Sequence, residues 1–266
     1  MGVVRSDAPS GENPHLIISF SLPLVPYPPL GLVSEDMNRY YFDWAATGIP
    51  TYSLQETAFG NPSSRHAEGR ASRAALEDAR LRIARLLGVD ASCLYFTSGA
   101  TESNAIVLQS LLQRSTKAGM LISSIEHPAI TENALALKRL GFPLSFIPVG
   151  ASGHIQEDSI YQILQNDTSI RLLCVMAVNN ETGAKMDMAS LVRASREASG
   201  PRASSLHFHC DAVQALAKTD VDLRVWDVDS ASFSAHKIGG PRGIGLLYLR
   251  KKIEAFTLGG SPEKLY

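Results

Sequence analysis

One lysine in the sequence stands between a polar cluster and a glycine-rich turn. Lys237 follows Ser234 and His236, and a run of glycines ending at Gly245 comes after it. A lysine amine in this setting is a candidate for covalent linkage to a carbonyl group as a Schiff base. The glycines do not form a dinucleotide fingerprint, because they lead into an apolar segment of strand type at 244–249, whereas that fingerprint joins a strand to a helix.

A second candidate site is the turn Ser98–Glu102, which follows an apolar segment and opens an expected helix. Small residues let a ligand approach the backbone, and the first N–H groups of a helix attract anions. The backbone around Ala100 and Thr101 could therefore hold a phosphate. An ordinary helix cap explains the same pattern equally well.

A carboxylate ends the expected strand at 206–211, and an amide follows three residues later. If a helix begins there, Asp211 and Gln214 lie on the same side of its first turn. Asp211 could then pair with a protonated ring nitrogen, and Gln214 could reach a neighbouring oxygen. The simpler interpretation is that Asp211 caps the helix.

Two more polar turns follow apolar segments. His127, in Ser124–Pro128, could stack its flat face on an aromatic ligand or move a proton, or it could be an ordinary surface histidine. Asn179 and Asn180 form a turn by default, although an amide there could also contact a ligand oxygen.

Segments of strand type alternate with segments of helical periodicity from Met37 onward. Strands are expected at 93–97, 120–123, 144–148, 171–175, 206–210 and 244–249, and helices at 71–86, 101–113, 129–140, 158–164 and 188–198. This alternation predicts an α/β fold, an open sheet with helices on both faces. Ligands of such sheets bind at the carboxyl ends of the strands, where all of these polar turns lie.

The composition excludes some classes of function. With 45% hydrophobic residues, 19% charged residues and a net charge of -1, the chain gives no support for a nucleic-acid partner. Four prolines break the apolar stretch 15–33, which excludes a membrane helix there. Residues 1–36 are expected to be a disordered tail or a misassigned start, before a folded domain at 37–258.

The chain has three cysteines, Cys93, Cys174 and Cys210, in apolar surroundings. Their odd number argues against a disulfide framework, and their spacing does not match a metal site. We therefore expect buried thiols, a reducing cytoplasmic location and no metal.

Taken together, the motifs resemble the cysteine desulfurases of the NifS/IscS type, within the class V aminotransferase group of pyridoxal-phosphate (PLP) enzymes of fold type I. The matching stretches run in unbroken order from about Tyr40 to Arg250: Tyr41–Thr47, Gly60–Ser64, Phe96–Asn104, Ile125–Ala129, Asn179–Gly183, Asp211–Gln214 and Ser234–Lys237. The resemblance implies a PLP-binding large domain with a mainly parallel mixed sheet and helices on both faces.

The resemblance also implies a role for each site residue. Lys237 would form the Schiff base and move the α-proton, and His127 would stack on the pyridine ring. Asp211 would pair with the ring nitrogen. The other expected cofactor-binding residues are Ala100, Thr101, Ser234 and His236 at the phosphate and Asn180 and Gln214 at the phenolic oxygen.

The sequence departs from the family after Leu258. The family continues with a glycine-rich stretch, a loop with the nucleophilic cysteine and a small C-terminal domain, whereas this chain has a divergent end at 259–266. None of its cysteines matches the nucleophile's position. The sequence therefore predicts a desulfurase-like chain that lacks the small C-terminal domain and is impaired in forming a persulfide.

Two other classes stay open at this point. The chain could be a non-catalytic PLP-binding remnant or scaffold, or another class V enzyme such as an aminotransferase or a selenocysteine lyase. The expected substrate is L-cysteine, converted to L-alanine and a persulfide that supplies sulfur for Fe–S clusters or tRNA thiolation. Expected partners are a second copy of the chain and a sulfur-acceptor or scaffold protein, with no nucleic acid and no membrane.

Overall fold

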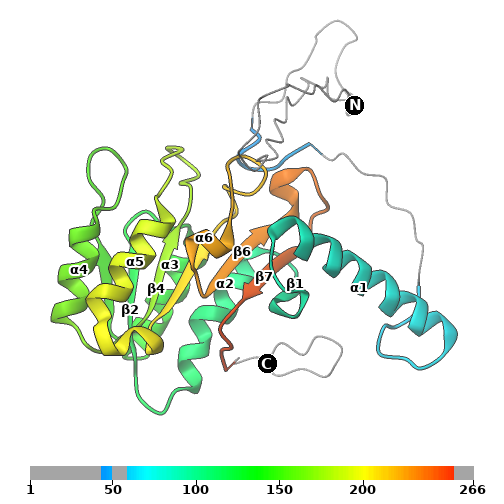
Figure 1. Ribbon diagram of the computed structural model, residues 1–266, viewed down its shortest axis with the longest axis horizontal. Coiled ribbons are helices and arrows are strands. Elements are labelled where there is room, and N and C mark those ends of the chain that lie inside the picture. Colours follow the sequence, from blue (N-terminus) through cyan, green and yellow to red (C-terminus); the bar gives the residue numbers. More distant parts are fainter. Residues whose placement is uncertain (1–42, 50–58, 255–266) are drawn as a thin grey trace, which may run out of the picture. The chain divides into compact units, whose positions relative to one another are not determined.

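A seven-stranded sheet forms the centre of the computed structural model, which describes residues 43–49 and 59–254. The strands are β1 (Leu94–Thr97), β2 (Gly119–Ser123), β3 (Leu144–Ile147), β4 (Ile170–Met176), β5 (His207–Asp211), β6 (Ser230–Ser234) and β7 (Gly245–Leu249). Their order is β1-β7-β6-β5-β4-β2-β3 (Figure 1). β7 is antiparallel to both of its neighbours, and the other pairs are parallel. The predicted mainly parallel mixed sheet is confirmed.

Helices cover both faces of the sheet. They are α1 (Ala67–Leu87), α2 (Ala100–Gln109), α3 (Pro128–Arg139), α4 (Glu157–Asn166), α5 (Met188–Ser199) and α6 (Leu223–Trp226), with 3₁₀ turns η1 (Ala91–Cys93), η2 (Ser110–Gln113), η3 (Gly200–Ser205) and η4 (Ala235–Ile238). One core cluster joins α1, α4, α5 and α6 to the sheet, and a second joins α2 and α3. In Figure 1, α4 and α5 lie on the same side of the sheet, as these clusters require.

β5 shows how the two faces differ. Phe208 and Cys210 point into the cluster under α4 and α5. Successive side chains of a strand alternate, so His207, His209 and Asp211 point to the opposite face, where α2 lies. All five residues are buried, and a polar row thus crosses the interior of the domain.

β6 is a strand that the sequence did not predict. It reads Ser-Ala-Ser-Phe-Ser and contains no β-branched residue, so its local preference for a strand is weak. Ala231 and Phe233 enter the core, and the three serines point to the polar row. Pairing with β5 and β7 on both sides decides its conformation.

The other predicted elements agree with the structure to within a few residues at their ends. Gly88 caps α1 in the left-handed conformation, with φ of 66°, as expected. The helix expected at 101–113 ends as an α-helix at Gln109 and continues as the η2 turn. The proposed tail at 1–36 and the divergent end at 259–266 lie outside the described residues.

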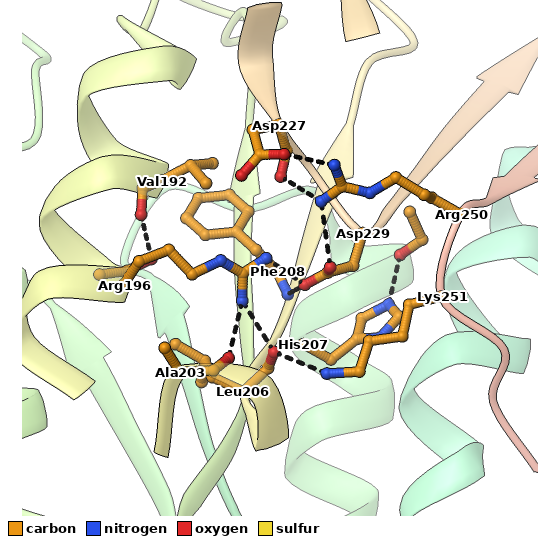
Figure 2. A network of polar contacts seen from close by, with 12 residues as sticks. Val192, Arg196, Ala203, Leu206, His207, Phe208, Asp227, Asp229, Arg250 and Lys251 are labelled. Atoms are coloured by element: carbon orange, nitrogen blue, oxygen red, sulfur yellow. Dashed lines mark hydrogen bonds and ion pairs between the residues drawn. The ribbon is translucent and has the colours of Figure 1, made fainter. Parts of the chain in front are cut away.

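Ion pairs fix the amino-terminal ends of β5 and β6, as Figure 2 shows. Asp229 Oδ2 lies 2.6 Å from Arg196 Nη2 of α5 and accepts the N–H of Phe208 at 2.7 Å. Arg250, after β7, bridges Asp229 and Asp227. Burial by itself raises the pKa of Asp229, but the Arg196 contact and neighbouring charges outweigh it and lower the pKa.

Among the described helices, none combines the length and apolar character that a membrane span needs.

Candidate functional site

One cavity at the carboxyl edge of the sheet brings the predicted site residues together. It has a volume of about 580 Å³. All nine predicted residues line it: Ala100, Thr101, His127, Asn180, Asp211, Gln214, Ser234, His236 and Lys237. Thr47 and Arg242 also line it, and the sequence argument assigned them no role. The cavity has the location that the strand ends predicted, and the roles toward a cofactor stay predictions.

The N-terminus of α2 forms one wall of the cavity. No side chain caps this helix at Gly99, and the Ser98 N–H donates to Glu102 Oε2 at 2.6 Å. A Cβ atom built at Gly99 would meet nothing within 4 Å, so this backbone is open toward the cavity. A Cβ at Gly245 would lie 2.5 Å from the Gly99 backbone, which requires glycine where β7 passes the turn. The wall offers N–H groups and a positive helix end to an anion.

Lys237 approaches the cavity from the η4 turn. Its Nζ donates a hydrogen bond to the carbonyl of Ala45 at 2.8 Å. Burial lowers the pKa of the amine, although Asp211 and Asp43 act in the opposite direction. A lowered pKa increases the fraction of neutral amine, which is the form that attacks a carbonyl carbon.

Residues 43–49 close the cavity beside Lys237. The Gly48 N–H donates to the carbonyl of His236 at 2.7 Å, and Thr47 Oγ1 lies 3.2 Å from His236 Nδ1. Gln214 Nε2 donates to the Ala45 carbonyl at 2.9 Å, and its Oε1 accepts from the Lys218 ammonium. The Gln214 amide and the Lys237 amine therefore donate to the same carbonyl, that of Ala45.

Asp211 is a buried carboxylate at the end of β5. Its Oδ2 accepts from Asn104 Nδ2 at 2.8 Å, and its Oδ1 accepts from the Val213 N–H at 3.1 Å. Burial raises its pKa, while the bonds from Asn104 and Val213 and the charges of His127 and Lys237 oppose the rise. The expectation of a helix start here is wrong: successive turns follow Asp211, and α6 begins only at Leu223.

His127 and Asn180 reach the cavity from neighbouring strand ends. His127 caps α3, because its Nδ1 accepts the Ala129 N–H at 3.1 Å. Asn179 fixes the turn before Asn180: its Oδ1 accepts from Thr182 N at 2.8 Å, and its Nδ2 donates to the Ile125 carbonyl at 3.1 Å. Asn179 therefore joins the two turns, and Asn180 faces the cavity.

Glu126, next to His127, is a buried acid to which the sequence gave no role. Its Oε1 accepts from the Ser123 hydroxyl and from the Met176 N–H, the latter at 2.7 Å. Its Oε2 is buried and has no hydrogen-bond partner among the described residues. Burial raises the pKa of Glu126 to about 8, so the carboxyl is mainly protonated at neutral pH.

This shift predicts a pH-dependent stability. The pKa of Glu126 in the folded protein is raised from 4.5 to about 8. The contribution of Glu126 to stability is therefore complete below its pKa in the unfolded chain, and it is lost as the pH rises through its pKa in the folded protein. The free energy of unfolding should decrease between pH 5 and pH 8, and in Glu126→Gln, an uncharged isostere, this decrease should be smaller by about 2 kcal/mol or more. Urea unfolding at several pH values measures this, and an equal fall in both proteins would contradict it.

The cysteines lie away from the cavity. Cys174 and Cys210 are fully buried, as expected, and Cys93 is partly exposed on η1, so the expectation of burial is wrong for Cys93. None of the three lines the cavity. The cavity wall thus holds an amine, a guanidinium, carboxylates, imidazoles and amides, but no thiol.

Sequence reasoning also missed the residues behind Asp211. Asn104 contacts both Asp211 and His209, and His209 contacts Ser230. One signal was readable: His207, His209 and Asp211 recur with period two, which places them on one face of a buried strand. The partners on α2 and β6 could be identified only from the three-dimensional packing.

The cavity fits a ligand with an anion at one end and a protonated ring nitrogen at the other. The open N-terminus of α2 suits a phosphate. The Asp211 carboxylate, which only accepts hydrogen bonds when it is ionised, suits the ring nitrogen. Lys237 stands at the same cavity and can reach a carbonyl group. These three features match the groups of PLP.

Comparison with known proteins agrees with this fit. Residues 41–264 match the model of the family Aminotransferase class-V. The cysteine desulfurase IscS of Dictyoglomus turgidum is 37% identical over 237 residues, which are 85% of this chain and 58% of that protein. The human cysteine desulfurase is 39% identical over 215 residues, 77% of this chain and 45% of that protein. The chain spans about half the length of the curated relatives it matches.

Solved structures show the same fold. A NifS-like protein superposes with a TM-score of 0.77 at 32% identity, over 84% of this chain and 63% of that chain. The structure of SspA in complex with cysteine gives a TM-score of 0.76 at 32% identity, over 84% and 66% of the two chains. The sheet is that of the PLP fold type I large domain. By its family match over most of its length, the chain belongs to the PLP-dependent class V aminotransferases.

Proposed function

We propose that the cavity binds PLP through Lys237 and acts on L-cysteine as a cysteine desulfurase does. The observation that carries the proposal is the placement of the Lys237 amine, the Asp211 carboxylate and the N-terminus of α2 around one cavity. When bound, PLP supplies an electron sink for negative charge at the α-carbon. The remaining chemistry is positioning and proton transfer by this chain's side chains.

Each side chain contributes a separate step. Lys237, with its lowered pKa, forms the covalent link to the cofactor and moves the α-proton. Asp211 holds a proton on the ring nitrogen, because a buried carboxylate favours a cation beside it. His127 would stack on the ring, and Gln214 and Asn180 would contact the phenolic oxygen of the bound cofactor.

The proposed phosphate site is the backbone of Ala100 and Thr101, with Ser234 and His236. The first residues of α2 have no side-chain cap, so their N–H groups are available to an anion. The Thr47 hydroxyl contacts His236 and holds that ring at the cavity wall. Arg242 adds a positive charge to the cavity lining.

The proposed reaction converts L-cysteine and a thiol to L-alanine and a persulfide. A thiolate attacks the substrate sulfur, the carbon–sulfur bond breaks with its electron pair on carbon, and a proton replaces sulfur there. Because no cysteine of this chain lines the cavity, the attacking thiol comes from outside the described site. SspA, a structural relative, was determined in complex with cysteine, which supports this substrate.

The test is an assay of the chain with PLP, L-cysteine and dithiothreitol. We expect L-alanine and sulfide in equal amounts, a large drop when the added thiol is omitted, and no stoichiometric persulfide on Cys93, Cys174 or Cys210. Sulfide without alanine, or an equal rate without PLP, would contradict the proposal. Persulfide on one of the three cysteines would contradict the external thiol.

The absence of a thiol from the cavity wall also supports a second candidate, another class V reaction or a PLP-binding scaffold. An aminotransferase would transfer the amino group to a 2-oxo acid, and a selenocysteine lyase would release selenium from selenocysteine. Both substrates can be added to the same assay. Bound PLP without any of these products indicates the scaffold.

The proposed partners follow the relatives. A homodimer, a sulfur-acceptor or scaffold protein and a role in supplying sulfur for Fe–S clusters or tRNA thiolation are proposed for the whole protein. Unpaired Cys174 and Cys210 are typical of a reducing compartment, and we propose the cytoplasm. Relatives include the protein named as a probable mitochondrial cysteine desulfurase in Schizosaccharomyces pombe.

A further inference from the structure

A chain of hydrogen bonds extends from Asp211 along the interior of the sheet. Asn104 Nδ2 lies 2.8 Å from Asp211 Oδ2, and Asn104 Oδ1 lies 2.8 Å from His209 Nε2. On the other side of the ring, His209 Nδ1 lies 2.7 Å from Ser230 Oγ. The same hydroxyl lies 2.8 Å from His207 Nε2. Five polar side chains thus link the cavity to the start of β5.

These groups are shielded from water. Asn104, His209 and Ser230 have no exposed surface, and Asp211 and His207 are each 5% exposed. Burial lowers the pKa of His209 to about 3 and that of His207 to about 4. Both rings are therefore neutral at physiological pH, and each carries one proton on one nitrogen.

The position of each proton follows from the state of Asp211. An ionised carboxylate only accepts, so Asn104 turns its amide N–H to Asp211 and its carbonyl to His209. His209 then carries its proton on Nε2, and its bare Nδ1 accepts the Ser230 hydroxyl. The Ser230 oxygen in turn accepts from His207, whose proton is also on Nε2. Every donor points toward Asp211.

Protonation of Asp211 reverses every bond. The carboxylic acid donates to the Asn104 carbonyl, and the flipped amide donates to His209 Nε2. His209 then carries its proton on Nδ1 and donates to Ser230. The Ser230 hydroxyl turns to His207 Nε2, so that His207 also becomes the Nδ1–H form. In both arrangements each of the four bonds joins one donor to one acceptor, whereas a mixed arrangement leaves two donors or two acceptors facing each other at one of these bonds. The Ser232 hydroxyl also lies 3.2 Å from His209 Nε2, and it can donate to or accept from this nitrogen in either arrangement.

We propose that Asn104, His209, Ser230 and His207 are positioning residues that form a two-state chain, in which the proton positions on both imidazoles follow the protonation of Asp211. In the state with Asp211 ionised, the chain directs its donors to the carboxylate and leaves the cofactor's ring nitrogen to carry the proton. This functional meaning rests on the proposed PLP site. The coupling between Asp211 protonation and the two imidazole tautomers does not depend on the cofactor and should be present in the cofactor-free protein.

Other charged or titratable groups act on the two ends. His127, Lys237 and Glu126 act near Asp211, and Asp229, Lys251, Arg196 and Arg114 act near His207. His207 also lines a second cavity of about 530 Å³. Figure 2 shows His207 beside the Arg196–Asp229 ion pair. None of these groups is a hydrogen-bonded member of the five-residue chain.

Nitrogen NMR of the chain labelled with ¹⁵N-histidine tests the proposal, because it distinguishes the two neutral tautomers. In the cofactor-free chain at high pH, His207 and His209 should both be Nε2–H. As pH falls and Asp211 takes up a proton, both should change to Nδ1–H with one midpoint. Different midpoints, a charged ring at neutral pH or Nδ1–H at all pH values would overturn the proposal.

Variants separate the links of the chain. In Ser230→Ala, the His209 tautomer should still change with pH, whereas the His207 tautomer should no longer change together with it. Ser195→Ala removes another buried hydroxyl, which donates to the Val192 carbonyl, and should behave like the parent. If His207 still follows His209 in Ser230→Ala, the chain does not carry the coupling. The parent titration decides the question even if Ser230→Ala fails to fold.

Added PLP gives the test that depends on the proposed function. A protonated ring nitrogen beside Asp211 should keep it ionised, so the tautomer midpoint should fall by about one pH unit or more. The midpoint is compared with the result of borohydride treatment at Lys237. Trapping of PLP on Lys237 without a change of midpoint would contradict only the functional role of the hydrogen-bond chain. A joint change of the two tautomers with pH, but without trapping on Lys237, would support the hydrogen-bond chain and contradict the PLP site.

Discussion

Lys237→Ala is expected to abolish turnover, with a loss of at least about 10³-fold in alanine formation. The substitution removes both the amine that links the cofactor and the group that moves the α-proton, and general acid–base catalysis alone contributes ~10²–10⁴-fold. Alanine formation from L-cysteine with added thiol measures the effect. The variant should still fold, because Lys237 is only partly buried and its amine contacts the Ala45 carbonyl.

A matched control is Lys138→Ala, which removes an exposed lysine in the last turn of α3. Its turnover should equal that of the parent. Thermal unfolding of both variants separates lost chemistry from lost structure. Retention of more than a tenth of the parent activity in Lys237→Ala would show that another group performs the proton transfer.

Asp211→Asn is expected to reduce turnover by roughly 10²–10³-fold while most of the PLP stays bound. An amide cannot keep a proton on the ring nitrogen, because it carries no charge. It also cannot accept from both Asn104 and Val213, since one side of the amide is a donor. Turnover and bound PLP, measured on the same samples, should therefore diverge.

Asp229→Asn is the control for removing a buried carboxylate. Asp229 pairs with Arg196 far along the sheet from the cavity, so its loss should lower stability by about 3 kcal/mol or more. The absorption spectrum of bound PLP should not change. Equal turnover in Asp211→Asn and the parent would reject the proposed role of Asp211.

The sequence predicted the fold class because its signals are local. β2 is buried along its whole length and β4 at every residue but Arg171, and such apolar segments are typical of strands between helices. β6 could not be found in this way, since Ser230, Ser232 and Ser234 have weak strand preference. Their burial depends on polar partners from β5 and α2, which no local pattern contains.

The same distinction between local signals and packing applies to the site residues. Residues at strand ends, such as Thr101 and Asp211, were identifiable because a parallel sheet gathers those ends at one edge. Glu126 and Asn104 were not, because their importance comes from contacts between elements far apart in sequence, such as Asn104 with His209. The turn after Asp211 was expected to be helical from spacing alone, and the structure shows a series of shorter turns.

The central claim is that this cavity binds PLP through Lys237. Its most direct test is incubation of the chain with PLP, reduction with borohydride and mapping of the modified peptide by mass spectrometry. We predict one reduced pyridoxyl group per chain, on Lys237, and none on Lys237 when the chain is unfolded before PLP is added. Modification of Lys218 or another lysine in place of Lys237, or no specific modification, would contradict the account.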